Sequence, residues 1–367
     1  MRFLLLFPLM VFLPSFALGQ SRPSLTLESG IAQVDIDLGG GSISSFTLGP
    51  GGVNPLSWDS LRPGSSAAQA AAPRSMGHFL CLDRWGPPTE AEQARGMGFH
   101  GEAPRVWWEV AHSPVAKDGW VEAEMSAALP LAGLTVSRKI RLMESEAVFT
   151  ATEAVTNTRH LGRIYNLVQH PSIGSPFLDE STIVDSNATR GFMQDRPLPN
   201  PEETEAQWPN AIRLDGESVD LRYLKDDHSP PVVSFAIDSE YGWIVASSPN
   251  SELLIGYLWR SEEHPWVNVW RNVRDGKPRA RGLEFGTTGL HQPGPVLVEK
   301  GKIFDRPLFR FIDADETQHF SYACFMAKIS SSWKGTRSVD YDGSKLIIEE
   351  SGDPGERIEL KTGSLFD

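Results

Sequence analysis

The segment YNLVQHP, from Tyr165 to Pro171, joins an apolar run typical of a β-strand to a single histidine. We expect the strand to hold His170 at its rim, because Pro171 removes a ladder donor and turns the chain outward. An imidazole with an unperturbed pKa near ~6.5 exchanges protons near neutral pH, which suits a general acid or base. Taken alone, the segment is explained more simply by a hydrogen-bonded structural histidine.

Strand-like alternation of apolar and polar residues continues along most of the chain, and almost no run has helical period. Strands are predicted at 24–27, 32–38, 43–48, 106–110, 120–128, 133–142, 147–157, 163–169, 232–237, 242–247, 253–259, 281–286, 320–325 and 345–349. Segments 61–72 and 197–209 are predicted to be surface loops. The sequence therefore predicts an all-β fold, with mainly antiparallel strands in two packed sheets of one domain over residues 20–367.

The first nineteen residues have the features of a cleaved secretory signal. Arg2 gives a positive start, an apolar stretch follows over 3–16, and the small residues Ala17 and Gly19 occupy the positions that a signal peptidase reads. The stretch is short and broken by prolines, and no later segment has the ~18 apolar residues that a membrane span needs. We expect a mature protein without membrane insertion, secreted or periplasmic, with cleavage near Gly19.

The charge balance narrows the choice of partners. The formal net charge is −13, which disfavours nucleic acid and anionic membrane surfaces, since binding to phosphates depends on Lys and Arg. The only two cysteines, Cys81 and Cys324, either form one bridge or remain buried thiols. No metal-binding motif is present, so no metal site is expected.

Three separated segments place a titratable residue beside glycine or proline near a strand. His100 lies in GMGFHGE (96–102), His170 lies in the segment quoted above, and Glu284 lies in GLEFGTTG (282–289). Flanking glycines let the backbone carry His100 close to a ligand. Apolar neighbours are expected to raise the pKa of Glu284 and make it a usable base near neutral pH.

In their order, these segments resemble the galactose mutarotase-like superfamily, the aldose 1-epimerases and their relatives, over most of the mature chain. The residues that carry the resemblance are Leu82-Asp83-Arg84-Trp85-Gly86, His100-Gly101, Val155-Thr156-Asn157, Asn166, His170-Pro171 and Glu284. The tract QHPSIGSPFLDE (169–180) is similar to less characterised members. Typical galactose mutarotases have H-x-Y-F-N-L where this chain has residues 171–176, which indicates a divergent branch.

The resemblance implies a large antiparallel β-sandwich, the galactose mutarotase-like supersandwich, with a sugar-binding cleft on its concave face. It implies that His170 protonates the ring oxygen as general acid and that Glu284 deprotonates the C1 hydroxyl as general base. It further implies that Arg84, His100 and Gln169 bind the sugar. Ring opening by such an acid and base uses no cofactor. We expect His170 and Glu284 to lie about the width of a sugar ring apart.

A further aspartate of the family, which holds sugar hydroxyls, has no convincing match. Asp226, Asp227 and Asp238 fall in the right interval without a recognisable flank, and the interval instead contains WRSEEHPWVNVWR (259–271). In the functional interpretation, Trp266 or Trp270 stacks on a sugar face and Arg271 reaches an acidic group. In the structural interpretation, the segment is a packed aromatic edge strand.

The sequence thus predicts a secreted carbohydrate-active protein that interconverts sugar anomers as aldose 1-epimerases do. A non-catalytic carbohydrate-binding protein of the same fold is one alternative. A relative of polysaccharide lyases or hydrolases is another, although the paired carboxylates of a glycosidase are not identifiable.

Overall fold

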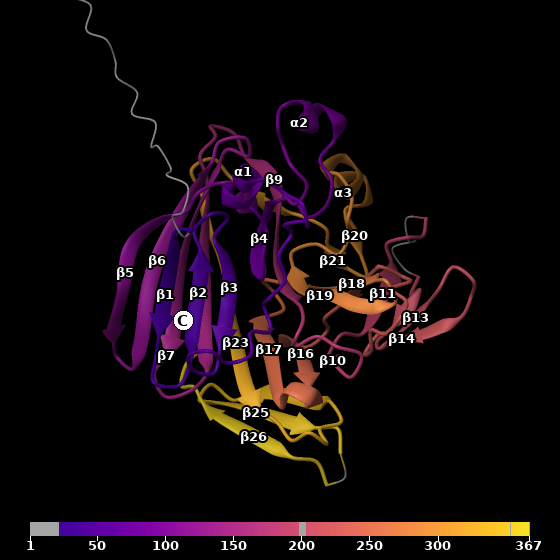
Figure 1. Cartoon of the computed structure of the whole chain (residues 1–367). Helices are drawn as coiled ribbons and strands as arrows, with labels where there is room; N and C mark the ends of the chain where they lie inside the picture. Colours follow the sequence, from indigo (N-terminus) through magenta and orange to yellow (C-terminus); the bar gives the residue numbers. More distant parts are fainter. Residues whose placement is uncertain (1–21, 198–202, 353, 367) are drawn as a thin grey trace, which may run out of the picture.

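The computed structural model describes residues 22–197, 203–352 and 354–366, so the predicted signal peptide at 1–19 lies outside the described residues. The fold is built on two large β-sheets (Figure 1). In spatial order, the 13-stranded sheet contains β1 (Ser24–Glu28), β2 (Gln33–Asp37), β3 (Ser42–Thr47), β4 (His78–Asp83), β9 (Arg163–Ile173), β19 (Lys277–Gly286), β18 (Trp266–Arg274), β15 (Val232–Ala236), β11 (Arg190–Met193), β12 (Ala206–Gln207), β13 (Asn210–Ile212) and β14 (Ser218–Asp220), with β22 (Arg310–Ile312) paired to β9.

The second sheet has eight strands. In spatial order these are β10 (Ile183–Ser186), β16 (Tyr241–Ser248), β17 (Leu253–Arg260), β23 (Thr317–Lys328), β8 (Val148–Asn157), β7 (Leu134–Met143), β6 (Trp120–Leu129) and β5 (Glu109–Lys117). A three-stranded sheet follows near the end of the chain, with β24 (Thr336–Tyr341), β25 (Lys345–Glu350) and β26 (Arg357–Lys361), and β20 (Lys302–Ile303) pairs with β21 (Arg306–Pro307).

Neighbouring strands pair antiparallel throughout both large sheets, which confirms the predicted all-β sandwich. Strands β5 to β8 form the meander that their consecutive alternation indicates. The predicted strand 106–110 is displaced, since β5 begins at Glu109. Strand β18 is central rather than at an edge, because it lies between β15 and β19.

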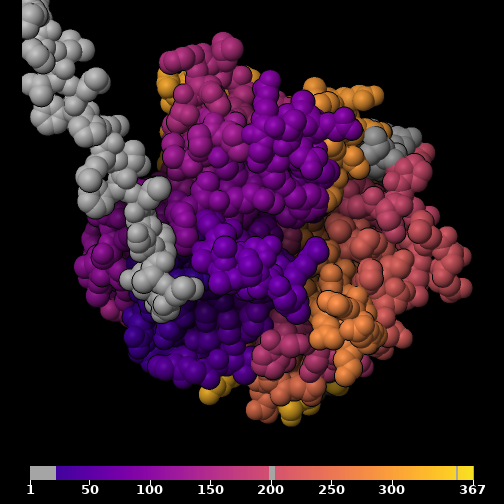
Figure 2. All heavy atoms as spheres, turned by 45° about the horizontal axis from the view of Figure 1, so that its top comes forward, coloured from indigo at the N-terminus to yellow at the C-terminus, as the bar shows by residue number. Residues whose placement is uncertain are grey.

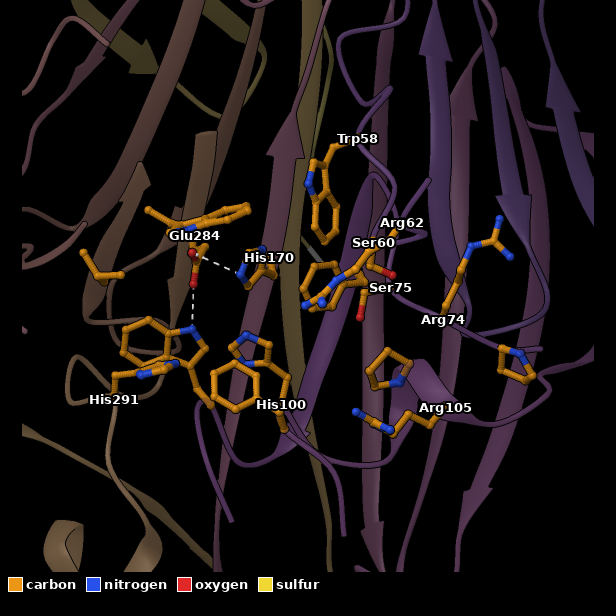
Figure 3. Close-up of a pocket in the computed structure, with 17 residues that line it drawn as sticks. Trp58, Ser60, Arg62, Arg74, Ser75, His100, Arg105, His170, Glu284 and His291 are labelled. Atoms are coloured by element: carbon orange, nitrogen blue, oxygen red, sulfur yellow. Dashed lines mark hydrogen bonds and ion pairs between the residues drawn. The ribbon is translucent and has the colours of Figure 1, made fainter. Parts of the chain in front are cut away.

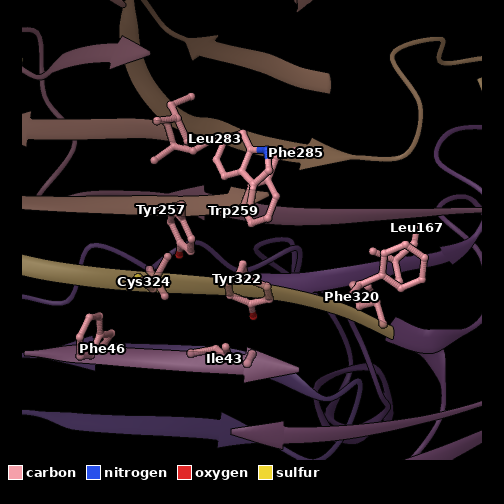
Figure 4. Packing of buried hydrophobic residues seen from close by; sticks show 14 of the residues in the cluster. Ile43, Phe46, Leu167, Tyr257, Trp259, Leu283, Phe285, Phe320, Tyr322 and Cys324 are labelled. Atoms are coloured by element: carbon pink, nitrogen blue, oxygen red, sulfur yellow. The ribbon is translucent and has the colours of Figure 1, made fainter. Parts of the chain in front are cut away.

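The main hydrophobic core lies between the two sheets. Aromatic side chains from both sheets meet there, and the rings of Trp259 and Phe285 stack with centroids 4.2 Å apart (Figure 4). Tyr165 and Leu167 of β9 belong to this core. Because side chains alternate along a strand, Val168 and His170 point to the opposite, outer face of the 13-stranded sheet.

Strand β9 continues two residues beyond Pro171, so the expected turn at this proline is wrong. The Ser172 amide donates to Gly77 O on the β4 side, which turns the nitrogen of Pro171 toward β19. The pairing between β9 and β19 runs from Val168–Gly286 to Ile173–Arg281 and is interrupted at His170 and Pro171. His170 is therefore a central strand residue and not a rim residue.

Helices are short and lie at the periphery of the sheets (Figure 1). They are α1 (Ala67–Ala71), α2 (Glu90–Ala94) and α3 (Gly294–Lys300), with 3₁₀ turns at Ala103–Arg105 and Pro249–Ser251. Both α1 and α2 begin with a capping box, built by Ser66 with Gln69 and by Thr89 with Glu92. Among the described residues, no helix is long and apolar enough to cross a membrane.

The three-stranded sheet β24–β26 covers the outer face of the eight-stranded sheet. Leu346 and Ile348 of β25 share a hydrophobic cluster with Leu254 and Leu258 of β17 and with Phe325 of β23. As a result, seven of the eight residues of β17 are buried, because the strand has apolar neighbours on both faces.

Both cysteines are buried free thiols. Cys81 lies on β4 in a small cluster on the outer face of the 13-stranded sheet, whereas Cys324 lies on β23 in the core between the sheets. The bridge considered from the sequence is therefore not formed, because the two residues belong to different sheets and different clusters.

Candidate functional site

A cavity of about 540 Å³ opens on the outer face of the 13-stranded sheet. Strands β4, β9, β18 and β19 contribute side chains to its floor, and loops at 58–62, 73–75 and 99–105 contribute to its rim. In the space-filling view of Figure 2, the surface is hollowed between purple atoms of the early loops and orange atoms near α3. This volume is typical of a small-molecule site.

His170 and Glu284 are in direct contact on the cavity floor (Figure 3). The His170 Nε2 atom lies 3.1 Å from Glu284 Oε1, and both side chains are almost fully buried. Their strands β9 and β19 are neighbours in the sheet, so two residues facing each other on the same side are held close. The expected separation by the width of a sugar ring is therefore wrong.

Burial governs the protonation of this pair. Desolvation lowers the pKa of His170 to about 3. Desolvation also raises the pKa of Glu284 well above its usual value, and the hydrogen bond from Trp85 only partly opposes this shift. Both shifts favour the neutral forms of the two groups, in which the pair shares one proton between Oε1 and Nε2.

The remaining atoms of the pair are also hydrogen-bonded. Trp85 Nε1 donates to Glu284 Oε2 at 2.6 Å. Ser172 Oγ lies 3.0 Å from His170 Nδ1 and donates to the His170 carbonyl oxygen at 3.5 Å. In the tautomer with the proton on Nδ1, this nitrogen donates to Ser172 Oγ and Nε2 is free to accept the proton of Glu284.

His100 lies on the cavity wall beside His170, with their ring centroids 5.2 Å apart. It has a left-handed backbone (φ 64°), and the next residue must be glycine, since a Cβ on Gly101 would lie 2.1 Å from Leu82 O. Gly86 N donates to His100 Nδ1 at 3.2 Å, so the proton of the neutral ring is on Nε2. Desolvation lowers the pKa of His100 well below its usual value, with a smaller contribution from His170.

Aromatic side chains form the walls of the cavity. Trp270 lines it and makes an edge contact with Trp58, with centroids 5.7 Å apart. Phe79 stacks on His170 at 4.2 Å, and Phe99 lies at the mouth with 47% of its surface exposed. Apolar ring faces around a few polar groups are a common arrangement for binding a sugar ring.

Four of the predicted sugar-binding residues do not line the cavity. Arg84 is held by ion pairs with Asp83 and Glu92, and Arg271 donates to backbone carbonyls of residues 227, 229 and 230. Both guanidinium groups are thus used to fix loops.

The other two, Gln169 and Trp266, are buried in packing. Gln169 points to the core between the sheets, where it contacts His78 Nε2 at 3.0 Å and donates to Glu153 at 2.7 Å. Trp266 donates to Pro307 O and packs on Phe192, at the start of β18 and four residues before Trp270. The alternation along strands explains why Gln169 and His170 point to opposite faces.

The three aspartates considered from the sequence do not reach the cavity either. Asp227 pairs with Arg213, Asp238 pairs with Arg306, and Asp226 is likewise not among the described lining residues. Glu284 is the one carboxyl group among the described residues that line the cavity.

Several lining residues were missed by the sequence reasoning. His291 makes an edge contact with Trp85, with centroids 4.6 Å apart, and desolvation lowers its pKa to about 4. Its flanks, in GLHQPGP (289–295), match the criterion that selected His100 and His170. Arg62 and Arg105 also line the cavity, but nothing in their sequence context distinguishes them from other loop arginines.

No group of three or more His, Cys, Asp or Glu residues that could hold a metal ion is present in the described part of the chain. The three histidines of the cavity have lowered pKa values. They are therefore neutral near neutral pH and act as donors and acceptors of hydrogen bonds.

The sequence matches no protein-family model and no curated protein. Solved structures are similar to it over most of its length. A galactose mutarotase related enzyme from Lactobacillus acidophilus is 12% identical, with 84% of this chain and 98% of that chain covered at a TM-score of 0.57. A galactose mutarotase-like protein from Clostridium acetobutylicum is 14% identical, with coverages of 83% and 95% at a TM-score of 0.58. One from Lactobacillus casei is 13% identical, with coverages of 83% and 100% at a TM-score of 0.56.

These structures share their overall fold with this chain while differing from it in most residues. The chain therefore has the galactose mutarotase-like fold.

Proposed function

We propose that this protein is an aldose 1-epimerase-like enzyme that interconverts the anomers of a sugar by general acid and base catalysis. The observation that carries the proposal is the contact between His170 Nε2 and Glu284 Oε1, at 3.1 Å, on the floor of a cavity with aromatic walls. The names of the structural neighbours support the same class of substrate.

The adjacency of the pair suits the geometry of ring opening. The hydroxyl and the ring oxygen of a cyclic hemiacetal are bonded to the same carbon, C1, so the groups that serve them must themselves be neighbours. The shared proton first passes from Glu284 to His170. The carboxylate then removes the C1 hydroxyl proton while the imidazolium protonates the ring oxygen; the bond from C1 to the ring oxygen breaks and the carbonyl forms.

Proton balance is maintained in this scheme. The pair gives one proton and takes one proton, so it returns to its initial charge, and the open-chain sugar rotates about C1–C2 before closing by the reverse steps. Before and after the reaction the buried pair is neutral, and the opposite charges formed by the internal proton transfer lie next to each other. Trp85 stabilises the carboxylate by donating to Oε2.

Other residues of the cavity fit the roles of binding and orientation. Trp270 offers an apolar face to a sugar ring, and Phe79 supports the His170 ring from below. The Nε2–H of His100 points away from its partner Gly86 N and is available to a sugar hydroxyl. These contacts would hold C1 against the pair.

The test is an assay of anomer interconversion by polarimetry, with freshly dissolved α-glucose and α-galactose. We expect His170→Gln and Glu284→Gln each to reduce kcat by about 10²–10⁴-fold, the usual contribution of a proton-transfer partner. His264→Gln is the matched control. His264 is fully buried and its pKa is also lowered to about 3 by desolvation, but it does not line the cavity.

The control separates a catalytic effect from a loss of packing. Rates are compared per folded molecule, determined by near-ultraviolet circular dichroism. Equal rates in the wild type and His170→Gln would overturn the assignment of His170.

A non-catalytic sugar-binding protein is the second candidate, and one observation favours it. The direct contact between His170 and Glu284 must open to admit the two reacting oxygens, and a site that keeps it closed would bind without turnover. Calorimetric binding of a sugar whose anomers are not interconverted would identify this case. Hydrolysis by two carboxylates gains no support, since Glu284 is the single carboxyl among the described lining residues.

We also propose that the protein acts outside the cytoplasm, in a secreted or periplasmic location. The basis is the sequence of residues 1–19, with its positive start, apolar stretch and small residues. Sequencing the N-terminus of protein recovered from a secreting host tests this, with a mature start near residue 20 expected and an intact Met1 contradicting it.

A further inference from the structure

The cavity has a cationic rim opposite the His170–Glu284 pair. Arg62, Arg74 and Arg105 line it, from the loops at 58–62, 73–75 and 99–105. Figure 3 shows these arginines on the side away from Glu284 and His291. The cluster is unusual for this chain, which carries 47 Asp and Glu residues against 34 Lys and Arg residues.

One of the three arginines is already neutralised and organises the loop. Arg74 makes two hydrogen bonds to Asp59, each 2.8 Å long, and donates to Ala70 O. Asp59 in turn accepts from the Leu61 amide at 2.8 Å. Arg74 thereby positions the segment that carries Arg62 and is not itself the ligand-binding group.

Arg62 and Arg105 have no such carboxylate partner among the described residues. In Figure 3 both side chains extend toward the interior of the cavity. Arg105 is held in place by packing against Gly98, since a Cβ added to Gly98 would lie only 2.1 Å from Arg105 Nε. It is also close enough to His100 to contribute to the lowered pKa of that ring, after desolvation and two histidines.

The remaining wall does not balance this charge. Glu284 is the only carboxyl among the described lining residues, it is bound to His170 and Trp85, and burial favours its neutral form by raising its pKa. A ligand with an anionic group would thus meet two guanidinium groups at the rim and no ionised carboxylate within the cavity. Guanidinium groups bind carboxylate, phosphate and sulfate oxygens by charge-assisted hydrogen bonds.

We propose that Arg62 and Arg105 form a subsite for an anionic substituent, so that the ligand of this cavity is an acidic sugar. This inference rests on the proposed sugar-binding function of the same cavity and names its substrate class. The ring lies over Trp270 with C1 at the His170–Glu284 pair, and the carboxylate, phosphate or sulfate lies at the opposite end between the two arginines.

Isothermal titration calorimetry at low salt tests the subsite independently of turnover. The probes are glucose, glucuronate and glucose 6-phosphate, and the matching galactose series, so that the arms separate carboxylate from phosphate recognition. We expect at least one acidic sugar to bind about tenfold or more tightly than its neutral parent, and the preference to weaken at high salt.

The variant Arg62→Gln/Arg105→Gln should abolish this preference. The control Arg274→Gln/Arg337→Gln removes the same two charges from exposed positions outside the cavity and should keep it. Equal binding of neutral and acidic sugars by the wild type, or an undiminished preference in the first variant, overturns the subsite. So does the absence of binding by every probe.

The two proposals fail in different ways. Preferential binding of an acidic sugar without interconversion of its anomers overturns the enzyme assignment and leaves the subsite in place. Interconversion with no preference between acidic and neutral sugars leaves the enzyme assignment and removes the subsite.

Discussion

Replacing Glu284 by glutamine should change the pH dependence of stability in a way that reports the shared proton. In the folded protein, desolvation raises the pKa of Glu284 well above its usual value, so we expect the pair to keep one proton at a pH where a free carboxyl is ionised. In the unfolded chain the carboxyl has its ordinary pKa and is ionised above about pH 5. The folded state therefore binds one proton more, and its stability falls as the pH rises.

The size of this effect follows from the proton count. One extra bound proton gives a slope of about 1.4 kcal/mol per pH unit, which amounts to at most about 2.7 kcal/mol between pH 5 and pH 7. Glu284→Gln lacks the titration, since the amide can donate to His170 Nε2 and accept from Trp85 Nε1 as the protonated acid does. The variant should gain stability relative to the wild type as the pH rises.

Urea unfolding of both proteins at pH 5, 6 and 7, followed by tryptophan fluorescence, measures the difference at each pH. Glu359→Gln is the control, because this exposed carboxyl has a lowered pKa, mainly through its hydrogen bond with Lys345, and is ionised in both states. Its difference from the wild type should stay constant. A constant difference for Glu284→Gln as well would mean that the folded pair holds no proton, and the proposed mechanism would lose its starting state.

Three further predictions concern other residues. Trp270→Ala should weaken sugar affinity about tenfold in calorimetry with little loss of stability. Trp266→Ala should instead lower the free energy of unfolding by about 3–5 kcal/mol. The reverse result would contradict the placement of Trp270 in the cavity and of Trp266 in the packed interior. Desolvation lowers the pKa of His291 to about 4, so the folded state binds fewer protons below about pH 6.5. Its contribution to stability should fall by at most about 1.4 kcal/mol per unit as the pH drops from 6.5 to 4, and unfolding of His291→Gln should lack this component. Cys81 and Cys324 should react with a thiol reagent only after denaturation, and fast reaction of either in the native protein would contradict its burial.

Most strands were predictable from the sequence, including β17, which is buried on both faces, whereas β4 was not. Burial alternates with the sequence pattern over residues 122–129 of β6 and 134–142 of β7. All six residues of β4 are buried, so the strand has no alternation to detect. The extension of β9 past Pro171 depends on which neighbour the missing amide faces, which only the assembled sheet determines.

Some residues of the site could be identified from the sequence, and others could not. His100 was identifiable because flanking glycines let the backbone come close to a ligand. Glu284 was identifiable because its apolar neighbours are expected to raise the pKa of a carboxyl group. The contact between Glu284 and His170 was not, since it depends on the register of two strands that are more than a hundred residues apart. Trp58 lies on a loop and Arg105 lies on a short 3₁₀ turn. In such segments the sequence has no regular apolar–polar repeat from which the direction of a side chain could be predicted.

The three-stranded sheet β24–β26 makes the end of the chain essential for solubility. It covers apolar side chains of the eight-stranded sheet, among them Leu254, Leu258 and Phe325. A chain shortened to end near Ile329 would expose them as one continuous patch, and such patches promote aggregation. A premature stop codon in this region would therefore remove the protein through misassembly, although every residue of the cavity would still be encoded.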